Sequence, residues 1–286
     1  MRPCYFFNIF HELGQKKSGI HSSVKIVRDA MRKTSYNCSD YYYKDIYTAP
    51  EQGGIFKSLS HIHNEISDFH RPKPFTKDKL FFLGGDHSIS VATLAHSLRR
   101  VNDPSQLKVI WVDAHADFNT YEKSETKNVH GMPLSYATWI DANKYIYNLY
   151  NDRMKLDPKN ILYIGLRDVD PYENALIKEL DINVITSREV NEDPEYACKR
   201  LSYFIDSTPV HLSFDVDALD PTIFPCTGTP VPDGIQLRQL IQLLSCEELQ
   251  ENKIATDIVE TNFELGDILD KTTSMISLQT LLRAII

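Results

Sequence analysis

The chain has 286 residues, of which 42% are hydrophobic and 24% are charged, as in ordinary soluble globular proteins. That length is sufficient to bury a full core without disulfides or structural metals, and we expect one domain over residues 1–286. The formal net charge of −8 argues against a nucleic-acid or anionic-membrane partner, because such partners require a basic surface.

The cysteines and the N-terminus favour a cytoplasmic location. The five cysteines, at positions 4, 38, 198, 226 and 246, show no C-x-x-C pair and no framework spacing. We therefore expect mostly structural free thiols in a reducing compartment. Residues 1–10 lack the long apolar segment of a secretory signal, and no run of 18 apolar residues could span a membrane.

Apolar periodicity divides the N-terminal part of the chain into alternating elements. The expected elements are a strand at residues 4–10, a helix at 22–33, a short strand within 37–47, an amphipathic helix at 55–69 and a linker at 71–77. His61, His63 and His70 lie in or just after the second helix, and we interpret them as part of an ordinary polar face.

The same alternation continues to the end of the chain. Strands are expected at residues 79–83, 107–112, 160–165, 183–186, 210–214 and 253–258, and helices near 89–100, from 133, near 173–180, after 194, at 237–249 and at 273–286. Strands that alternate with helices form a parallel sheet covered on both faces. We therefore predict an α/β fold, a single-domain three-layer αβα structure with a mainly parallel sheet.

Metal-capable side chains follow five of the predicted strands, and ligands of such folds bind beyond the carboxyl ends of the strands. They are His87 after the first of these strands, Asp113, His115 and Asp117 after the second, Asp168 and Asp170 after the third, Asp215 and Asp217 after the fourth, and Glu260 after the fifth. In extended backbone alternate side chains share a face, so the three ligands after the second strand can converge. Any one of these residues could instead be a cap or a solvated turn, but the topology brings all five strand ends together.

The number and type of these side chains indicate a pair of metal ions. Two imidazoles and four carboxylates are too many for one tetrahedral zinc ion, and four carboxylates would balance two divalent cations. The six ligands are His87, Asp113, His115, Asp117, Asp215 and Asp217. Oxygen-rich ligation with some imidazole favours Mn(II), with Co, Ni, Fe or Zn as alternatives.

Four motifs resemble the arginase branch of the ureohydrolases, which also include agmatinases and formimidoylglutamases. The motifs are Gly84-Gly85-Asp86-His87-Ser88, Asp113-Ala114-His115-Ala116-Asp117, His130-Gly131-Met132-Pro133 and Ser213-Phe214-Asp215-Val216-Asp217-Ala218-Leu219-Asp220-Pro221. They stand in the family's order and spacing, and the resemblance covers nearly the whole chain from about residue 80. It implies an arginase/deacetylase-like fold, a homo-oligomer (trimer or hexamer), and two Mn(II) ions on the six ligands above. It also implies hydrolysis of a guanidinium group to urea and an amine through a metal-bridging hydroxide.

The resemblance also implies roles for three residues around the metals. His130 matches the family's proton shuttle, and its alternative is a helix-entry histidine with a structural hydrogen bond. Glu260 matches a carboxylate that pairs with the substrate guanidinium, and Thr229 matches a hydroxyl beside that group, with an ordinary turn threonine as the alternative. Together with Asp117, which would take or hold a proton, His130 and Glu260 are the expected catalytic residues.

The loop after Asp117 favours L-arginine, with L-ornithine and urea as products. By resemblance, Asn119, Ser124, Thr126 and Asn128 would hold the α-carboxylate, although serine and threonine stand in the reverse of the expected order. Ser124 and Thr126 could each instead be an ordinary surface-loop residue. Asp170 would bind the α-ammonium group, with Glu173 helping through water. Two alternatives stay open: an agmatinase or other guanidino-compound ureohydrolase, and a non-catalytic, metal-binding regulatory homologue.

Overall fold

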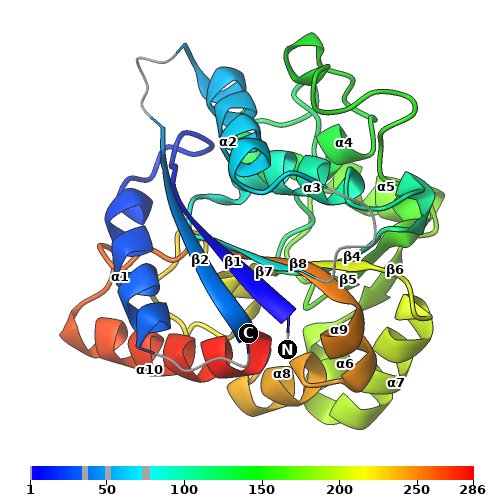
Figure 1. Ribbon diagram of the computed structural model, residues 1–286. Helices are drawn as coiled ribbons and strands as arrows, with labels where there is room; N and C mark the ends of the chain where they lie inside the picture. The colour runs from blue at the N-terminus through cyan, green and yellow to red at the C-terminus, as the bar shows by residue number, and fades with distance from the viewer. Residues whose placement is uncertain (1, 34–37, 49–52, 73–77) are drawn as a thin grey trace.

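The computed structural model describes residues 2–33, 38–48, 53–72 and 78–286, and its centre is a sheet of eight strands (Figure 1). The strands are β1 (Arg2–Phe10), β2 (Cys38–Tyr47), β3 (Lys79–Leu83), β4 (Lys108–Val112), β5 (Ile161–Ile164), β6 (Asn183–Ile185), β7 (Val210–Asp215) and β8 (Lys253–Val259). Their order across the sheet is β2-β1-β3-β8-β7-β4-β5-β6, and every pairing is parallel. The predicted α/β class with a parallel sheet is confirmed.

Helices cover both faces of this sheet (Figure 1). On one face lie α2 (Ile55–Phe69), α3 (Ser90–Leu98), α4 (Pro133–Ala137) and α5 (Pro171–Glu179). On the other lie α1 (Ile20–Arg32), α6 (Ser187–Glu192), α7 (Pro194–Ile205), α8 (Leu237–Leu244), α9 (Glu247–Asn252) and α10 (Ile268–Ile285). No helix in the described part of the chain is long and apolar enough to cross a membrane.

The two helical layers arise because successive strand residues point to opposite faces. Phe6 of β1 and Phe81 of β3 belong to the core beneath α1 and α10, whereas their neighbours Phe7 and Phe82 belong to the core beneath α2 and α3. All four rings are at most 1% exposed. Burying one such side chain contributes about 1.5–3 kcal/mol to the stability of the fold. Because both faces of the central strands are buried, most residues in these strands are apolar.

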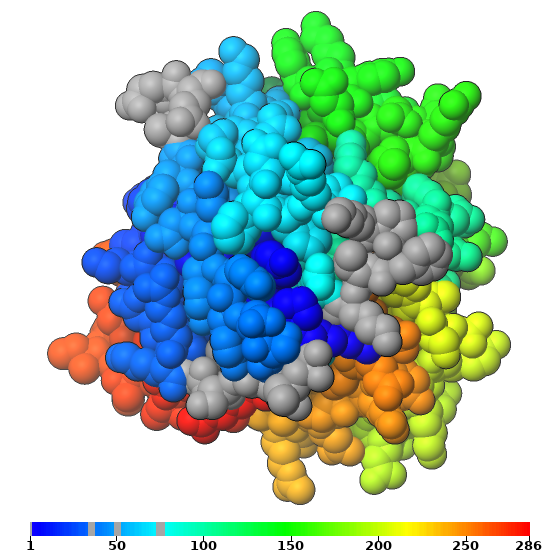
Figure 2. All heavy atoms as spheres, viewed as in Figure 1, coloured from blue at the N-terminus to red at the C-terminus, as the bar shows by residue number. Residues whose placement is uncertain are grey.

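The strand β2 is longer than the short strand predicted within residues 37–47; residue 37 lies outside the described residues. It forms one edge of the sheet, and its outer side lies at the surface (Figure 2). Tyr41, Tyr42 and Tyr43 are 38–42% exposed, although the first and third stack on Phe6 of β1. These three consecutive tyrosines face alternate sides of the sheet, and all are half-exposed. The sequence of this strand therefore lacks the alternation of apolar and polar residues that usually marks a strand.

The helical boundaries differ from the predictions in three places. The single helix predicted at residues 237–249 is wrong, since the chain leaves helical geometry at Cys246, whose φ and ψ are −56° and 131°, between α8 and α9. The short helix α6 was not predicted, because six residues give too little periodicity. The helix α10 begins at Ile268, five residues before the predicted start, where the Asp267 side chain accepts a hydrogen bond from the Asp270 backbone N–H at 2.9 Å.

The prediction that the cysteines are free thiols is wrong for four of the five. Disulfides join Cys4 to Cys38, between β1 and β2, and Cys198 to Cys246, between α7 and the start of α9. Cys226 remains a buried thiol. The paired residues are 34 and 48 positions apart in sequence and become neighbours only through the fold, so their spacing could not reveal them.

The polar-face interpretation is wrong for His63 and His70. These side chains are only 6% and 4% exposed. The reason is that the surface of α2 that packs against α3 extends beyond the row of aliphatic side chains from which the buried face was predicted. His63 Nδ1 lies 3.3 Å from the Ala92 carbonyl oxygen, and His70 Nδ1 lies 3.2 Å from Nε2 of the buried His96. His61 is half-buried.

The burial of His63 predicts a loss of stability in acid. Burial lowers the pKa of His63 to about 4, from an ordinary value of 6.5. Between these values the unfolded chain takes up a proton that the folded chain refuses, so stability falls as the pH falls, by about 3 kcal/mol in total. We expect His63→Asn, which keeps a donor for the Ala92 carbonyl, to flatten this dependence.

Urea unfolding of the metal-free protein at pH 7 and pH 4.5 measures the effect. His61→Asn on the same helix is the matched control and should leave the pH dependence as it is in the wild type. An equally steep acid loss in the His63 variant would contradict the assignment.

Two sequence-based predictions stay predictions. Residues 73–77 of the expected linker lie outside the described residues. The division into a single domain over residues 1–286 is likewise an expectation from length and pattern.

Candidate metal centre and active site

The topology brings the predicted ligands to one end of the sheet. The strands β3, β8, β7, β4 and β5 are neighbours, and each is followed by one or more of the predicted residues. After β3, Gly84 and Gly85 have φ values of 80° and 89°, a left-handed conformation that permits a sharp turn into His87. Asp113 comes directly after β4, and Asp215 is the last residue of β7.

Two of the predicted catalytic residues have a strained backbone. Asp117 has a φ of 48° and Glu260 a φ of 62°, values that non-glycine residues seldom adopt. Such conformations cost about 1–3 kcal/mol and persist only where the surrounding structure imposes them. The strained turns place both side chains at the end of the sheet where the candidate metal ligands lie, with Asp117 Oδ2 2.9 Å from His87 Nδ1 and Glu260 Oε1 2.8 Å from the His87 backbone nitrogen.

His87 is the centre of a first cluster of carboxylates. Its Nδ1 atom lies 3.1 Å from Asp113 Oδ2, 2.9 Å from Asp117 Oδ2 and 3.2 Å from Asp215 Oδ2. The ring is fully buried, and the three carboxylates are at most 8% exposed. His87, Asp113 and Asp117 form a group whose ligand atoms lie within 4.8 Å of one another.

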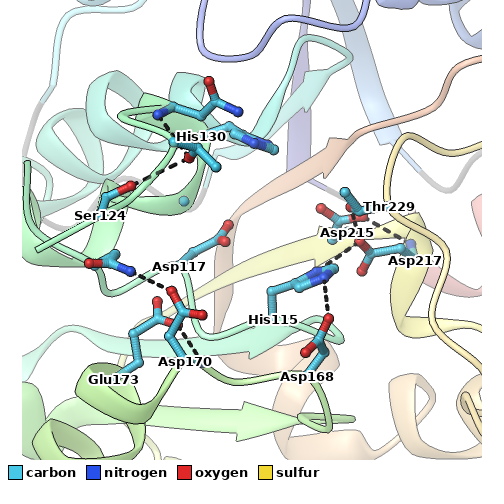
Figure 3. Close-up of a pocket in the computed structure, with 14 residues that line it drawn as sticks. His115, Asp117, Ser124, His130, Asp168, Asp170, Glu173, Asp215, Asp217 and Thr229 are labelled. Atoms are coloured by element: carbon cyan, nitrogen blue, oxygen red, sulfur yellow. Dashed lines mark hydrogen bonds and ion pairs between the residues drawn. The ribbon is translucent and has the colours of Figure 1, made fainter.

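His115 is the centre of a second cluster. Its Nδ1 atom lies 3.1 Å from Asp217 Oδ2 and 3.5 Å from Asp113 Oδ1. Figure 3 shows the imidazole of His115 directed at the carboxylates of Asp215 and Asp217. Asp113, His115 and Asp217 form the second group with metal-ligand spacing, so Asp113 belongs to both groups and offers one oxygen to each.

Without cations this arrangement places like charges together in a buried site. Burial and the charges of Asp217 and Asp113 raise the pKa of Asp215 well above its usual range. Burial and the charge of Asp113 also raise the pKa of Asp117 to about 6. Two divalent cations would remove this repulsion, because they supply the positive charge that the four carboxylates require.

The hydrogen bonds of His87 also fit a metal ligand. Its Nε2 atom lies 2.8 Å from Ser213 Oγ, which can accept the Nε2 proton. In that tautomer the buried Nδ1 carries a lone pair, and it has no hydrogen-bond partner among the described residues. A lone pair facing three carboxylate oxygens requires a proton or a metal cation between them, and the carboxylates accordingly raise the pKa of His87 against the effect of burial. A metal ion would take the place of that proton, so the donor set fits a bound metal.

A cavity of about 180 Å³ opens above the two clusters and brings most of the predicted site residues together. The predicted residues that line it are His115, Asp117, Asn119, Ser124, Thr126, Asn128, His130, Asp170, Glu173, Asp215, Asp217 and Thr229. The other three, His87, Asp113 and Glu260, are at most 2% exposed and lie beneath them. Asp168 also lines the cavity, with its Oδ2 atom 3.6 Å from His115 Nε2.

Glu260 connects the cavity wall to the cluster of candidate metal ligands around His87. Its Oε1 atom accepts a hydrogen bond from the His87 backbone N–H at 2.8 Å and lies 3.1 Å from His130 Nδ1. Its Oε2 atom accepts a 2.6 Å hydrogen bond from Gln15 Nε2. Burial by itself lowers the pKa of His130, but the hydrogen bond to Glu260 raises it to about 9. The His130 imidazole is therefore protonated near neutral pH and can donate that proton.

The loop after Asp117 is joined to the start of α5. Asn119 Nδ2 donates to Asp170 Oδ2 at 2.7 Å, and the Glu173 carboxylate accepts from the backbone N–H groups of Phe118 (2.9 Å) and Asp170 (3.2 Å). Burial raises the pKa of Glu173 to about 7. Glu173 thus braces the loop in addition to lining the cavity.

The hydroxyl groups farther along the loop fix its own turn. Ser124 Oγ lies 3.4 Å from Thr126 Oγ1 and accepts from the Lys127 backbone N–H at 3.1 Å. Thr126 Oγ1 accepts from the Asn128 N–H at 3.2 Å. Thr229, on the opposite wall, donates its hydroxyl proton to Asp217 Oδ2 at 3.0 Å. Both walls therefore present polar groups in a defined conformation.

Sequence reasoning missed Gln15 and Ser213 as supports of the site. Gln15 lies 245 residues before Glu260 in the chain, and nothing near it marks a functional segment. Ser213 could have been found, since it stands two residues before Asp215 on the same strand and therefore faces the same side of the sheet.

The sequence profile of the Arginase family matches residues 10–286. The chain belongs to the arginase family. The arginase of Schizosaccharomyces pombe is 30% identical over 283 residues, which are 92% of this chain and 85% of that protein. The arginase of Neurospora crassa is 41% identical over 187 residues, which are 63% of this chain but only 52% of that longer protein. The chain thus matches about half the length of some arginase-family relatives.

Solved structures of arginase-family proteins have the same fold. The arginase of Bacillus subtilis superposes with a TM-score of 0.81 at 26% identity, over 100% of this chain and 98% of that chain. The Entamoeba histolytica arginase, solved in complex with L-ornithine, has a TM-score of 0.84 at 24% identity, over 98% of each chain. The predicted arginase-like fold and the family resemblance are confirmed.

Proposed function

We propose that this arginase-family protein hydrolyses L-arginine to L-ornithine and urea with two bound Mn(II) ions. The observation that carries the proposal is the convergence of two histidines and three aspartates into two ligand groups that share Asp113, with Asp215 Oδ2 3.2 Å from His87 Nδ1. The cavity above these groups ends in the Asn119–Asp170 pair, which suits an amino acid's head group. The profile match over residues 10–286 supports the same reaction.

The bound ions would supply positive charge and an activated water beside the guanidinium carbon. Hydrolysis breaks one C–N bond, and the leaving amine must gain a proton. Asp117, a member of the first ligand group, lines the cavity and can accept the proton that the water loses. His130, which lines the cavity and contacts Glu260, can deliver a proton to the amine. Glu260 keeps the His130 imidazole protonated and supplies negative charge toward the guanidinium group.

Recognition of the α-carboxylate distinguishes L-arginine from agmatine, which keeps the amine but lacks that carboxylate. Asp170 provides an anion for the α-ammonium group, and Asn119, Ser124 and Asn128 provide neutral donors for the α-carboxylate. An arginase-family relative was solved with L-ornithine, the amino acid that this reaction would release. A site that must pair both charged groups discriminates strongly against a substrate that lacks one of them.

The test is urea release from L-arginine and from agmatine after incubation with Mn(II). We expect urea from L-arginine and little or none from agmatine. Faster release from agmatine would identify another guanidino compound as the substrate. A metal-loaded preparation inactive on all guanidino compounds would identify a non-catalytic metal-binding homologue.

Substitution of Asp170 tests the proposed head-group site. We expect Asp170→Asn, which keeps the size of the side chain, to lower kcat/KM for L-arginine roughly 100-fold through a raised KM, because the α-ammonium group loses its anion. Mn(II) content should not change. Residual turnover of 5-guanidinopentanoate, which keeps the carboxylate but has no α-ammonium group, is the internal comparison and should change much less. Equal losses on both substrates would contradict a role in head-group recognition.

A further inference from the structure

Trp111 makes two contacts with the proposed metal ligands. It lies in β4 two residues before Asp113, so both side chains are on the same face of the strand. Its indole Nε1–H donates to Asp113 Oδ2 at 3.0 Å. Its ring stacks on the imidazole of His87, with ring centroids 4.1 Å apart and planes inclined by 6°. The indole is fully buried.

The hydrogen bond from Trp111 determines how Asp113 faces the two ligand groups. Oδ1 of Asp113 accepts from the His115 backbone N–H at 2.8 Å, on the side of the second group. Oδ2 accepts from the indole, on the side of His87. A carboxylate rotates easily about its last bond, and two donors on opposite oxygens hold it in the one plane that presents an oxygen to each group.

The stacking contact similarly fixes His87. The imidazole is held at Nε2 by Ser213 Oγ and on one face by the indole, so its Nδ1 atom can point only toward the carboxylates. Both contacts of Trp111 therefore act on the group of His87, Asp113 and Asp117. Only the contact with the shared Asp113 reaches the second group, and the oxygen that faces that group, Oδ1, is still held by the His115 N–H. In the second group, other contacts hold His115 and Asp217. Asp217 accepts hydrogen bonds from the Ala114 backbone N–H at 3.2 Å and from the Thr229 hydroxyl, and His115 lies between the carboxylates of Asp217 and Asp168.

We infer that Trp111 is a positioning residue that preorganises one of the two metal sites, the one formed by His87, Asp113 and Asp117. The inference rests on the proposed metal centre. Trp111 raises the affinity of that site by aligning two of its three ligands before the ion binds. Among the described residues Trp111 contacts two of the three ligands of this site, but only the shared Asp113 of the other site, so its loss weakens the two sites unequally.

Metal titration of Trp111→Phe tests this asymmetry. Phenylalanine keeps an aromatic face for His87 but cannot donate to Asp113. By isothermal titration with Mn(II), we expect one site to weaken roughly 10- to 100-fold while the other changes by less than about 3-fold. Trp139→Phe is the matched control, because Trp139 packs on Tyr147 after α4, and it should bind both ions as the wild type does. Equal affinities of Trp111→Phe and wild type would overturn the inference, as would an equal loss at both sites.

A second variant guards against a packing defect from the smaller ring. The chain has only two tryptophans, so in a Trp139→Phe background Trp111 can be replaced by benzothienylalanine, which has the same shape with sulfur in place of N–H. We expect the same selective weakening. If the isosteric ring restored full affinity, the hydrogen bond would have no positioning role and the inference would fail.

Intrinsic fluorescence gives a readout that needs no turnover. Mn(II) bound next to His87 should quench Trp111 by close contact. The Trp139→Phe protein should therefore lose most of its emission on titration, and Trp111→Phe should lose little. Absence of quenching in a protein that binds two ions would contradict the placement of an ion beside this indole. If the wild type bound no metal at all, the proposed function would fail first, and that outcome is separately visible in the titration.

Discussion

Asp113→Asn is expected to abolish metal loading and to reduce urea formation by roughly 1,000-fold or more, about 4 kcal/mol of lost transition-state stabilisation. Asp113 is the residue common to both ligand groups, and its two oxygens face His87 and His115 respectively. Asparagine has nearly the same shape but carries no charge and only one acceptor oxygen. Both ions should therefore bind more weakly, in contrast to the selective effect expected at Trp111.

Thermal unfolding with and without Mn(II) distinguishes metal loss from misfolding. Without metal, Asp113→Asn should still unfold in one cooperative transition, but at a lower melting temperature than the metal-free wild type. Against the effect of burial, His115 and His87 hold the pKa of Asp113 below its usual range, and the variant loses these favourable contacts. Added Mn(II) should stabilise the wild type and not the variant, because only binding to the folded state raises stability.

Asp168→Asn is the control for a carboxylate on the same cavity wall. Asp168 lines the cavity, but its side chain is 66% exposed and lies outside both ligand groups. The Asp168→Asn variant should bind as much Mn(II) as the wild type and should keep most of the stabilisation that Mn(II) provides. Metal binding by Asp113→Asn at wild-type affinity would exclude Asp113 as the shared ligand.

The proximity of the proposed metal ligands could be predicted from the sequence because a parallel sheet converts order in the chain into proximity in space. Asp113 directly follows β4, and Asp215 is the last residue of β7. These two strands are neighbours in the sheet. A strand is recognisable from its apolar run, and the residue after it must lie at the carboxyl edge with the others. The proximity of these residues therefore requires no knowledge of loop conformation.

Contacts made by loops could not be predicted in this way. The Gln15–Glu260 hydrogen bond joins residues 245 positions apart, and the position of Gln15 depends on how the segment after β1 turns back over the sheet. The burial of His63 was missed for a related reason. The periodicity of α2 marks its aliphatic face, but the width of the buried face depends on how closely α3 packs against it.

The sequence also gave no indication of which polar residues brace others. Glu173 was predicted as a substrate residue, and its two oxygens accept backbone N–H groups from the loop after Asp117 and from Asp170. A carboxylate has several acceptor positions, and only coordinates show how many are already used by the protein. The same limit applies to Thr229, whose hydroxyl is engaged by Asp217.

His130→Asn is expected to lower kcat roughly 100- to 10,000-fold while leaving both metals bound, the range typical of a lost general acid or base. His130 belongs to neither ligand group, and its contact with the metal cluster runs through Glu260. Asparagine can still donate to Glu260 Oε1 from a side-chain nitrogen, and the backbone hydrogen bond from residue 130 to the Gly14 carbonyl is independent of the side chain. The variant should therefore fold normally and keep the shape of the cavity.

The division of the effect between kcat and KM identifies its cause. If His130 moves a proton to the leaving amine, the loss falls on kcat, because the substrate still binds at the metals and the head-group site. If His130 only shapes the cavity wall, KM should rise instead and kcat should change little. Mn(II) content measured on the same preparation excludes an indirect effect through metal loss. Turnover at the wild-type rate with two ions bound would remove His130 from the mechanism, and the proton for the amine would then have to come from Asp117.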